Sequence, residues 1–418
     1  MFATFKQVFK STNKDIRNRI FFTLGALIIF SLGNAITVPG MERIVGDLGF
    51  LELLNAMAGG GLKNFSIFAL GVMPYITASI VMQLLQMDII PYFKELKEMG
   101  EEGRRKINKI TRYAGIGIAF IEGYIFSVMF IGENADPMRY IEVTLILTAG
   151  TAFLLWLGDQ ITKKGIGNGI SLIIMAGIVN TIPSMFVEAF NSFVPLDGSG
   201  NLFIGILSYV FFVLIYLAII VGVIFTQQAE RRIPIQYSNK SNSAFGGRQS
   251  YLPLKLNSAN VIPVIFASAL IAVPTTIAYF TKSEGVTLFI NKYLSYTSPT
   301  GFLLYILLII LFVYFYTYVV INPTELSKNL NKSGGYIPGI RPGNETSTYI
   351  SKVLKRITFL GAIFLSIIAA LPILFTAFSG LPSTVTVGGT GLLIVVGVVL
   401  ETYKQLESSV ASRNYNRR

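Results

Sequence analysis

The 418-residue sequence contains no cysteine and no histidine. Without cysteine there is no disulfide framework and no thiolate metal site. Without histidine the commonest general base is missing, and with it the Ser-His-Asp and Cys-His catalytic arrangements and most transition-metal sites. The composition therefore excludes catalytic mechanisms and metal sites that depend on histidine or cysteine.

Charge is also scarce. Charged residues make up 13% of the chain and hydrophobic residues 52%, whereas an average soluble domain has about 25% charged residues. A bilayer accommodates this much apolar surface, and a soluble core does not. Apolar runs of about twenty residues predict membrane-spanning helices. The sequence thus predicts an all-α polytopic membrane protein with about ten spans, at residues 20–38, 67–87, 111–132, 141–158, 168–188, 202–226, 258–280, 301–321, 353–373 and 387–404.

The basic residues predict the orientation of these spans. If the N-terminus is inside, 29 of the 34 Lys and Arg residues fall in inside segments. The five that fall outside are Arg43, Lys63, Arg139, Lys282 and Lys292. By the positive-inside rule, both termini are then cytoplasmic. The net charge of +12 also predicts contact with anionic phospholipids, and RNA contact stays open for the large inside loops.

Two segments do not fit simple spans. Residues 49–66 are moderately apolar, too short to cross a membrane, and contain the run Gly59-Gly60-Gly61. We expect a short re-entrant helix and a flexible joint, which must line a cavity because irregular backbone at membrane depth needs protein or water around it. An ordinary external loop is the alternative. Residues 1–19 are basic with scattered aromatic residues and predict a cytoplasmic amphipathic segment, with a disordered tail as the alternative.

Two inside loops are longer than a connection needs. Alternating residues around Gly246-Gly247 in loop 227–257 predict a hairpin that protrudes into the cytoplasm. Loop 322–352 is of similar size and carries GGYIPGIRPG at its centre. Long loops with Gly and Pro at defined positions favour docking of a partner.

The chain has few residues that suggest chemistry. No GxxxxGK[ST] motif occurs, so we expect no bound nucleotide and no cofactor. Glu122 is the one acid well inside a predicted span, either as a functional group or as a satisfied contact between helices. Pro74, beside Gly71, breaks the second span at mid-membrane. Three glycines at 165, 167 and 169 predict a sharp re-entry into the fifth span.

These motifs resemble the SecY family, the pore-forming subunits of the bacterial Sec protein translocase (SecY/SecE/SecG). SIFALGVMPYITASIVMQLLQ (66–86) and WLGDQITKKGIGNGISLIIMAGI (156–178) are similar to its two signature segments. Further similar segments follow in the same order, namely GEEGRRKINKITRY (100–113), ERRIPIQY (230–237), YLPLKLNSANVIPVIFAS (251–268), GGYIPGIRPG (334–343) and GGTGLLIVVGV (388–398).

The resemblance implies a protein-conducting channel in the bacterial cytoplasmic (inner) membrane. Such a channel passes unfolded secretory proteins across the membrane and releases membrane-protein helices laterally into it. Two inverted five-helix halves, expected at 20–195 and 196–404, surround a central pore, and 405–418 form a cytoplasmic tail. An accessory SecY for specialised glycoprotein export is one alternative. A secondary transporter is another, disfavoured because the midplane is aliphatic rather than polar.

The resemblance also implies site residues. When the family's motifs are matched to this sequence, the pore ring corresponds to Val72, Ile76, Ile174, Ile178, Ile265 and Ile394. The plug covers about 55–66 and includes Asn55, Gly59, Gly60, Gly61 and Ser66. The lateral gate has Thr77 and Glu122 as polar positions, and Arg248 and Arg341 are the expected partner-docking residues.

The implied partners are the sources of energy and the companion subunits. A passive channel without a nucleotide site takes its energy from the SecA motor ATPase, a translating ribosome or the proton-motive force. SecE-type and SecG-type subunits are expected alongside. The substrates are unfolded polypeptides that carry signal sequences, so no catalytic activity is expected of the chain itself.

Overall fold

The computed structural model describes residues 14–44, 51–86, 90–132, 136–194, 202–237, 250–281, 284–295, 298–379, 381 and 383–415. These residues form two compact units. The first contains the described residues up to Phe211, together with Thr276–Glu284 and the chain from Phe375 onward. The second contains Phe212–Thr275 and Gly285–Leu374.

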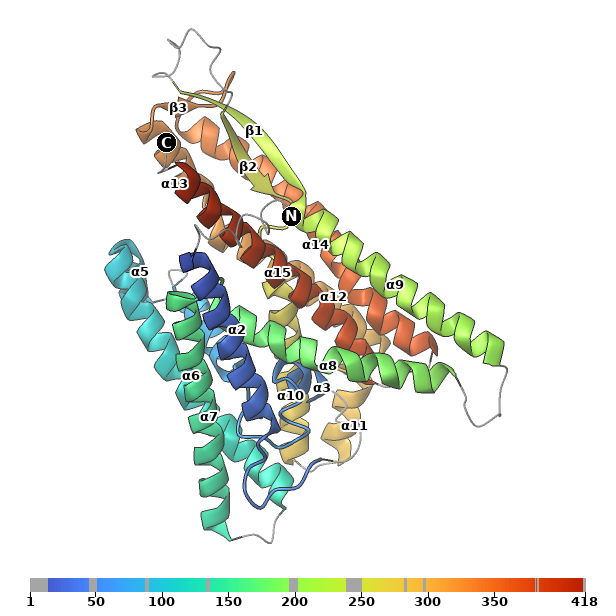
Figure 1. The fold of residues 1–418 in the computed structure, drawn as a ribbon. Coiled ribbons are helices and arrows are strands. Elements are labelled where there is room, and N and C mark those ends of the chain that lie inside the picture. Colours follow the sequence, from blue (N-terminus) through green and yellow to red (C-terminus); the bar gives the residue numbers. More distant parts are fainter. Residues whose placement is uncertain are drawn as a thin grey trace. The chain divides into compact units, whose positions relative to one another are not determined.

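Helices dominate both units (Figure 1). The elements before the unit boundary in α9 are α2 (Lys14–Ala35), α3 (Glu52–Met57), α4 (Met73–Leu85), α5 (Pro91–Glu98), α6 (Glu101–Ile131), α7 (Pro137–Lys164), α8 (Gly169–Phe193) and α9 (Leu202–Gln228). The elements after it are β1 (Glu230–Tyr237), β2 (Ser250–Lys255), α10 (Ile262–Thr281), α11 (Glu284–Tyr293), α12 (Pro299–Val320), α13 (Pro323–Lys332), β3 (Gly335–Tyr336), α14 (Asn344–Ser379) and α15 (Ser383–Tyr415).

Each of the ten predicted spans falls on a helix, namely α2, α4, α6, α7, α8, α9, α10, α12, α14 and α15. Within the described residues, seven helical segments are long and apolar enough to cross a membrane. The prediction of an all-α polytopic membrane protein is therefore confirmed. Of the predicted N-terminal segment 1–19, residues 1–13 lie outside the described part of the chain, and Lys14 to Arg19 are the first turns of α2.

The second predicted span differs from the expectation. Pro74 does not kink a long helix, because it lies in the first turn of α4, which begins at Met73. Proline is tolerated there, since the first N–H groups of a helix have no partner within it. The residues before Met73 run through turns, and their backbone is covered by neighbouring helices: Thr151 of α7 donates a hydrogen bond to the carbonyl of Gly71 at 3.2 Å.

Helices α6 and α7 pack against each other along the first unit (Figure 1). Near one end the hydroxyls of Ser127 and Thr144 lie 3.2 Å apart. Near the other, Arg112 pairs with Asp159. Ser127 and Thr144 are buried, and buried polar groups in a bilayer need partners from neighbouring helices; together with the half-exposed ion pair, this contact aligns the two helices.

The turn between α7 and α8 confirms the predicted re-entry. Gly167 has φ +87°, which only glycine adopts readily. Asn168 then caps α8, because its side-chain oxygen accepts hydrogen bonds from the N–H groups of Ile170 and Ser171. A Cβ on Gly169 would lie 1.9 Å from the carbonyl oxygen of Gly158, so glycine is also what lets α8 start directly against α7.

The second unit contains a small sheet with the strand order β2-β1-β3. Strands β1 and β2 pair antiparallel (Figure 1), with Arg232 opposite Pro253, which confirms the strand pairing predicted for loop 227–257; the predicted turn at Gly246-Gly247 lies outside the described residues. Strand β3 comes from the other long loop and pairs with the end of β1 at Gln236. The sequence did not predict this pairing. A shared apolar core that includes Ile233, Leu330, Ile337 and Ile350 joins the sheet to α13 and α14.

Candidate functional site

The predicted plug is a loop closed at its base. Helix α3 starts three residues before the expected Asn55, and turns then lead to Ser66. The two ends of the loop pair with each other: the N–H of Val38 donates to the carbonyl of Phe65 at 2.9 Å, and that of Ile67 to Ile36 at 3.0 Å. Thr37 and Ser66 form the antiparallel bridge between them. We call residues 36–38 and 65–67 the neck and residues 51–64 the plug segment.

Glycines let the plug segment approach its neighbours backbone to backbone. A Cβ on Gly177 of α8 would lie 2.6 Å from the carbonyl oxygen of Met57 and 3.0 Å from the nitrogen of Gly59. A Cβ on Gly71 would lie 3.2 Å from the Cα of Ala58. Helix α15 also packs against α3. The plug segment is therefore seated against α8, α15 and the residues that lead into α4.

The expected hinge glycines have a defined conformation. Gly59 and Gly60 have φ of +72° and +80°, a region that side chains with a Cβ rarely adopt. A Cβ on Gly61 would lie 2.7 Å from the hydroxyl oxygen of Ser66. Close packing and positive φ thus require glycine here in the seated state, and the hinge role stays a prediction.

Polar groups of the plug segment bond largely within it. The amide nitrogen of Asn55 donates to a carboxylate oxygen of Glu52 at 3.0 Å, and its oxygen accepts from the backbone N–H of Lys63 at 2.9 Å. A cavity of about 320 Å³ separates this face from part of α8. Most of its lining residues are polar, among them Lys63, Asn180 and Glu188, so the cavity can hold water beside the plug segment.

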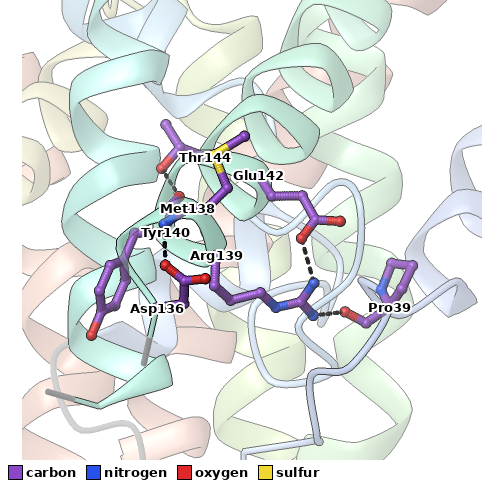
Figure 2. Close-up of polar contacts among 7 residues, drawn as sticks. All are labelled: Pro39, Asp136, Met138, Arg139, Tyr140, Glu142 and Thr144. Carbon is purple, nitrogen blue, oxygen red and sulfur yellow. Dashed lines mark hydrogen bonds and ion pairs between the residues drawn. The ribbon is translucent and has the colours of Figure 1, made fainter. Parts of the chain in front are cut away.

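An arginine on α7 holds the chain just beyond the neck. Figure 2 shows Arg139 reaching the carbonyl of Pro39, to which it donates a hydrogen bond, and pairing with Glu142 at 2.7 Å. Asp136 caps the same end of α7, because its carboxylate accepts from the N–H of Met138 at 3.2 Å. The entry to the plug segment is thereby fixed to α7.

All six predicted ring residues are buried. Their exposed fractions lie between 0% for Ile178 and 9% for Ile265. Five of them belong to the first unit, and Ile265 belongs to the second. Ile178 packs on Gly391 of α15, where a Cβ would lie 2.7 Å from its side chain, so α8 and α15 are in contact three residues before Ile394. Packed helix interfaces are buried too, and the pore-lining role stays a prediction.

The remaining predicted residues have separate environments. Thr77 is half-buried, and its hydroxyl donates to the carbonyl of Met73 in its own helix at 3.3 Å. Glu122 is half-buried on α6, and no hydrogen bond joins it to Thr77 within the described residues. Arg341 is exposed between β3 and α14, and its carbonyl accepts from Thr346 at 2.9 Å. Arg248 lies outside the described residues.

Two residues that lie beside the plug segment were not identified from the sequence. Gly177 is one, and Asn34 of α2 is the other. Asn34 is 3% exposed, and among the described residues neither its amide nitrogen nor its oxygen has a hydrogen-bond partner. Its side chain adjoins Gly59 and Gly61. The sequence does mark Asn34, because it is a polar residue near the end of the apolar run 20–38.

Comparison with known proteins gives one consistent result. The family model described as SecY matches residues 66–403. The protein translocase subunit SecY of Halalkalibacterium halodurans is 48% identical to this chain over an alignment of 428 residues. The alignment covers 99% of this chain and 99% of the relative.

Two solved structures resemble the fold. One is a SecY channel whose plug domain is described as stabilising the closed state and maintaining a membrane seal; it has a TM-score of 0.64 at 21% identity and covers 94% of this chain and 92% of its own. The other is Sec61 in the canine ribosome-channel complex, with a TM-score of 0.65 at 20% identity and the same coverage.

Proposed function

This chain belongs to the SecY family, and from that premise we propose how it acts as the channel subunit of a protein translocase. The observation that carries the proposal is the plug segment, seated through Gly177 and Gly71 against the helices that bear predicted ring residues. A channel of this kind passes unfolded secretory proteins across the membrane and releases membrane-protein helices laterally into it.

The six aliphatic residues Val72, Ile76, Ile174, Ile178, Ile265 and Ile394 form the constriction. A translocating polypeptide has no fixed sequence, so the pore cannot use specific hydrogen bonds to hold it. A narrow apolar collar closes around any chain and excludes water when it is empty, which blocks ions. The motif carries this assignment, and the burial of all six side chains agrees with it and equally with a packed helix interface.

The plug segment is the second barrier. Seated, it fills the space beside Gly177; displaced, it clears the path for the polypeptide. Thr77 and Glu122 serve the lateral gate, through which an apolar signal sequence reaches lipid. The absence of further predicted intramembrane acids and the aliphatic ring argue against a secondary transporter, which normally has a polar site at the membrane midplane.

Other proteins supply the energy for polypeptide transport and form the companion subunits of the complex. The sheet of β1, β2 and β3 unites the two long loops into one surface, which presents Arg341 to a cytoplasmic partner. SecA, a translating ribosome or both dock there, and Arg248 contributes from the same loop system. SecE-type and SecG-type subunits complete the complex in the bacterial cytoplasmic membrane, with both termini of this chain in the cytoplasm. Reporter fusions after residues 100, 240 and 335 test this orientation and are expected to be cytoplasmic.

The pore is tested by cross-linking and by conductance. A photo-reactive side chain at position 76 or 265 is expected to cross-link to a stalled secretory precursor. Ile76→Asn and Ile174→Asn are expected to let water enter the collar and to raise the resting ion conductance of reconstituted channels.

Val187→Asn provides the matched control, because Val187 lies on α8, as Ile174 does, but is 58% exposed. Equal conductance of the ring variants and this control would show that the ring assignment is wrong. An absence of precursor cross-links at both positions would count against the pore itself.

A further inference from the structure

Helix α11 exposes an apolar face for which the channel function gives no role. Leu288, Phe289 and Tyr293 are 69%, 57% and 43% exposed. With Lys292, also exposed, they occupy neighbouring positions around the helix at 100° per residue. Ile290, on the opposite side, is 6% exposed. The helix is therefore apolar on two sides, and only one of them is covered by the protein.

Short contacts fasten this helix to the start of α12. The hydroxyl of Thr300 donates to the carbonyl of Tyr293 at 3.0 Å. Ser298 caps α12 and also donates to the carbonyl of Ser295 at 2.7 Å. A Cβ on Gly301 would lie 2.0 Å from that same carbonyl oxygen, so the first turn of α12 packs directly on the residues that follow α11.

This attachment fixes the depth of α11 relative to the membrane. Helix α12 carries an exposed leucine stripe, made of Leu303, Leu307 and Leu311 at 70%, 54% and 51% exposure, on a segment apolar enough to span a membrane. Leu303 lies four residues after Pro299, roughly 6 Å along the helix. The end of α11 is thus within about one helical turn of the first lipid-facing leucine. The sheet is joined to the other end of α12 through α13 and β3.

We propose that α11 is an interfacial anchor, with Leu288, Phe289 and Tyr293 inserted into the headgroup–acyl boundary of the membrane leaflet opposite the sheet. Aromatic residues gather at this level because the ring is apolar and the hydroxyl can stay hydrated. The rings of Phe289 and Tyr293 pack with centroids 5.0 Å apart. The ammonium of Lys292 lies 5.5 Å from the Tyr293 ring centroid, where it can reach lipid phosphates while its methylenes stay against apolar surface.

The occupant of this face is lipid because the face continues the surface of a membrane span. A basic residue within an apolar and aromatic face matches an interface that offers acyl chains below and phosphates above. The inference requires only that α12 spans the membrane. It is independent of which polypeptides the channel transports.

The test uses the natural lack of cysteine, which makes any introduced thiol unique. Leu288→Cys and Phe289→Cys are labelled with a nitroxide in the complete channel complex, reconstituted in vesicles of phosphatidylethanolamine and phosphatidylglycerol. Collision with oxygen, which concentrates in lipid, is compared with collision with a water-soluble nickel chelate. Leu303→Cys is the lipid reference and Arg43→Cys, at an exposed position, is the water reference.

Both α11 labels are expected to lose most of the nickel-chelate accessibility seen at Arg43→Cys and to gain oxygen accessibility toward that of Leu303→Cys. Labels that behave as Arg43→Cys does would place the face in water and overturn the proposal. Low accessibility to both reagents would mean that a protein covers the face, which also overturns it. Because both positions are exposed, substitution leaves the fold intact, and unchanged precursor transport verifies this.

Discussion

Replacing Gly177 with alanine tests the seating of the plug segment most directly. The added Cβ would lie 2.6 Å from the carbonyl oxygen of Met57 and 3.0 Å from the nitrogen of Gly59. Both are backbone atoms, so no side chain can rotate away to make room. Either α8 or the plug segment must shift to make room.

Overpacking of this kind costs about 1–3 kcal/mol. If the whole cost falls on the seated state, the ratio of displaced to seated channels rises roughly 5–150-fold. Resting conductance is proportional to the displaced fraction while that fraction is small. Gly177→Ala is therefore expected to raise the resting conductance by a factor in this range, measured in planar bilayers without any substrate.

Two glycines provide controls. A Cβ on Gly25 of α2 or on Gly117 of α6 would meet nothing within 4 Å, so alanine at either position should leave conductance unchanged. In a channel that lacks the plug segment, Gly177→Ala should add no further leak, because the alanine then has nothing to displace. A conductance equal to that of the two controls would refute the reasoning, as would an added leak in the plug-deleted channel.

Three further changes test separate contacts. Asn34→Leu removes two buried polar groups that lack partners among the described residues, so it should stabilise the seated state. Added to Gly177→Ala, it should lower the resting ion conductance of that variant. A higher conductance would mean that the Asn34 amide holds the plug segment in place. Arg139→Ala frees the chain beyond the neck and should raise the thiol reactivity of an introduced Asn64→Cys severalfold, and unchanged reactivity would count against it. Arg341→Glu reverses an exposed charge and should weaken SecA affinity and precursor transport, whereas Lys332→Glu on α13 should do so less; equal effects would remove Arg341 as a specific contact.

The helices were predictable from the sequence because the bilayer imposes a simple length and polarity rule. Runs such as 202–226 are too apolar for water and long enough to span, and each lies on a helix. The re-entry at Gly167 and the hairpin of loop 227–257 were also predictable, since glycine spacing and residue alternation are local signals. Helices α5, α11 and α13 were missed because they are short and amphipathic, and the span rule does not detect such segments.

Contacts between distant segments could not be predicted. Strand β3 has two residues, too few for a pattern, and its pairing with β1 depends on the fold of the second unit. The start of α4 at Met73 was misjudged because Pro74 fits both a kink and a first turn. Gly177 looked like any glycine in an apolar span, and its importance comes only from the backbone of Met57 beside it. The role of Gly177 therefore depends on a packing partner more than a hundred residues away.

The way in which the plug segment is held suits a barrier that must open and close. Its contacts with Gly177 and Gly71 involve backbone atoms, so they depend on shape, whereas Leu51 and Leu62 are buried in an apolar core with residues of α6 and α7. The polar contacts of Asn55, with Glu52 and with the N–H of Lys63, lie inside the segment. Displacement leaves these bonds intact, so their free energy does not oppose opening. The neck pairs strand to strand between residues 36–38 and 65–67, which gives the segment a fixed base. It follows that the plug segment can move as one body about its neck, at a cost that combines the fit of a few glycines with the loss of apolar burial at Leu51, Met57 and Leu62.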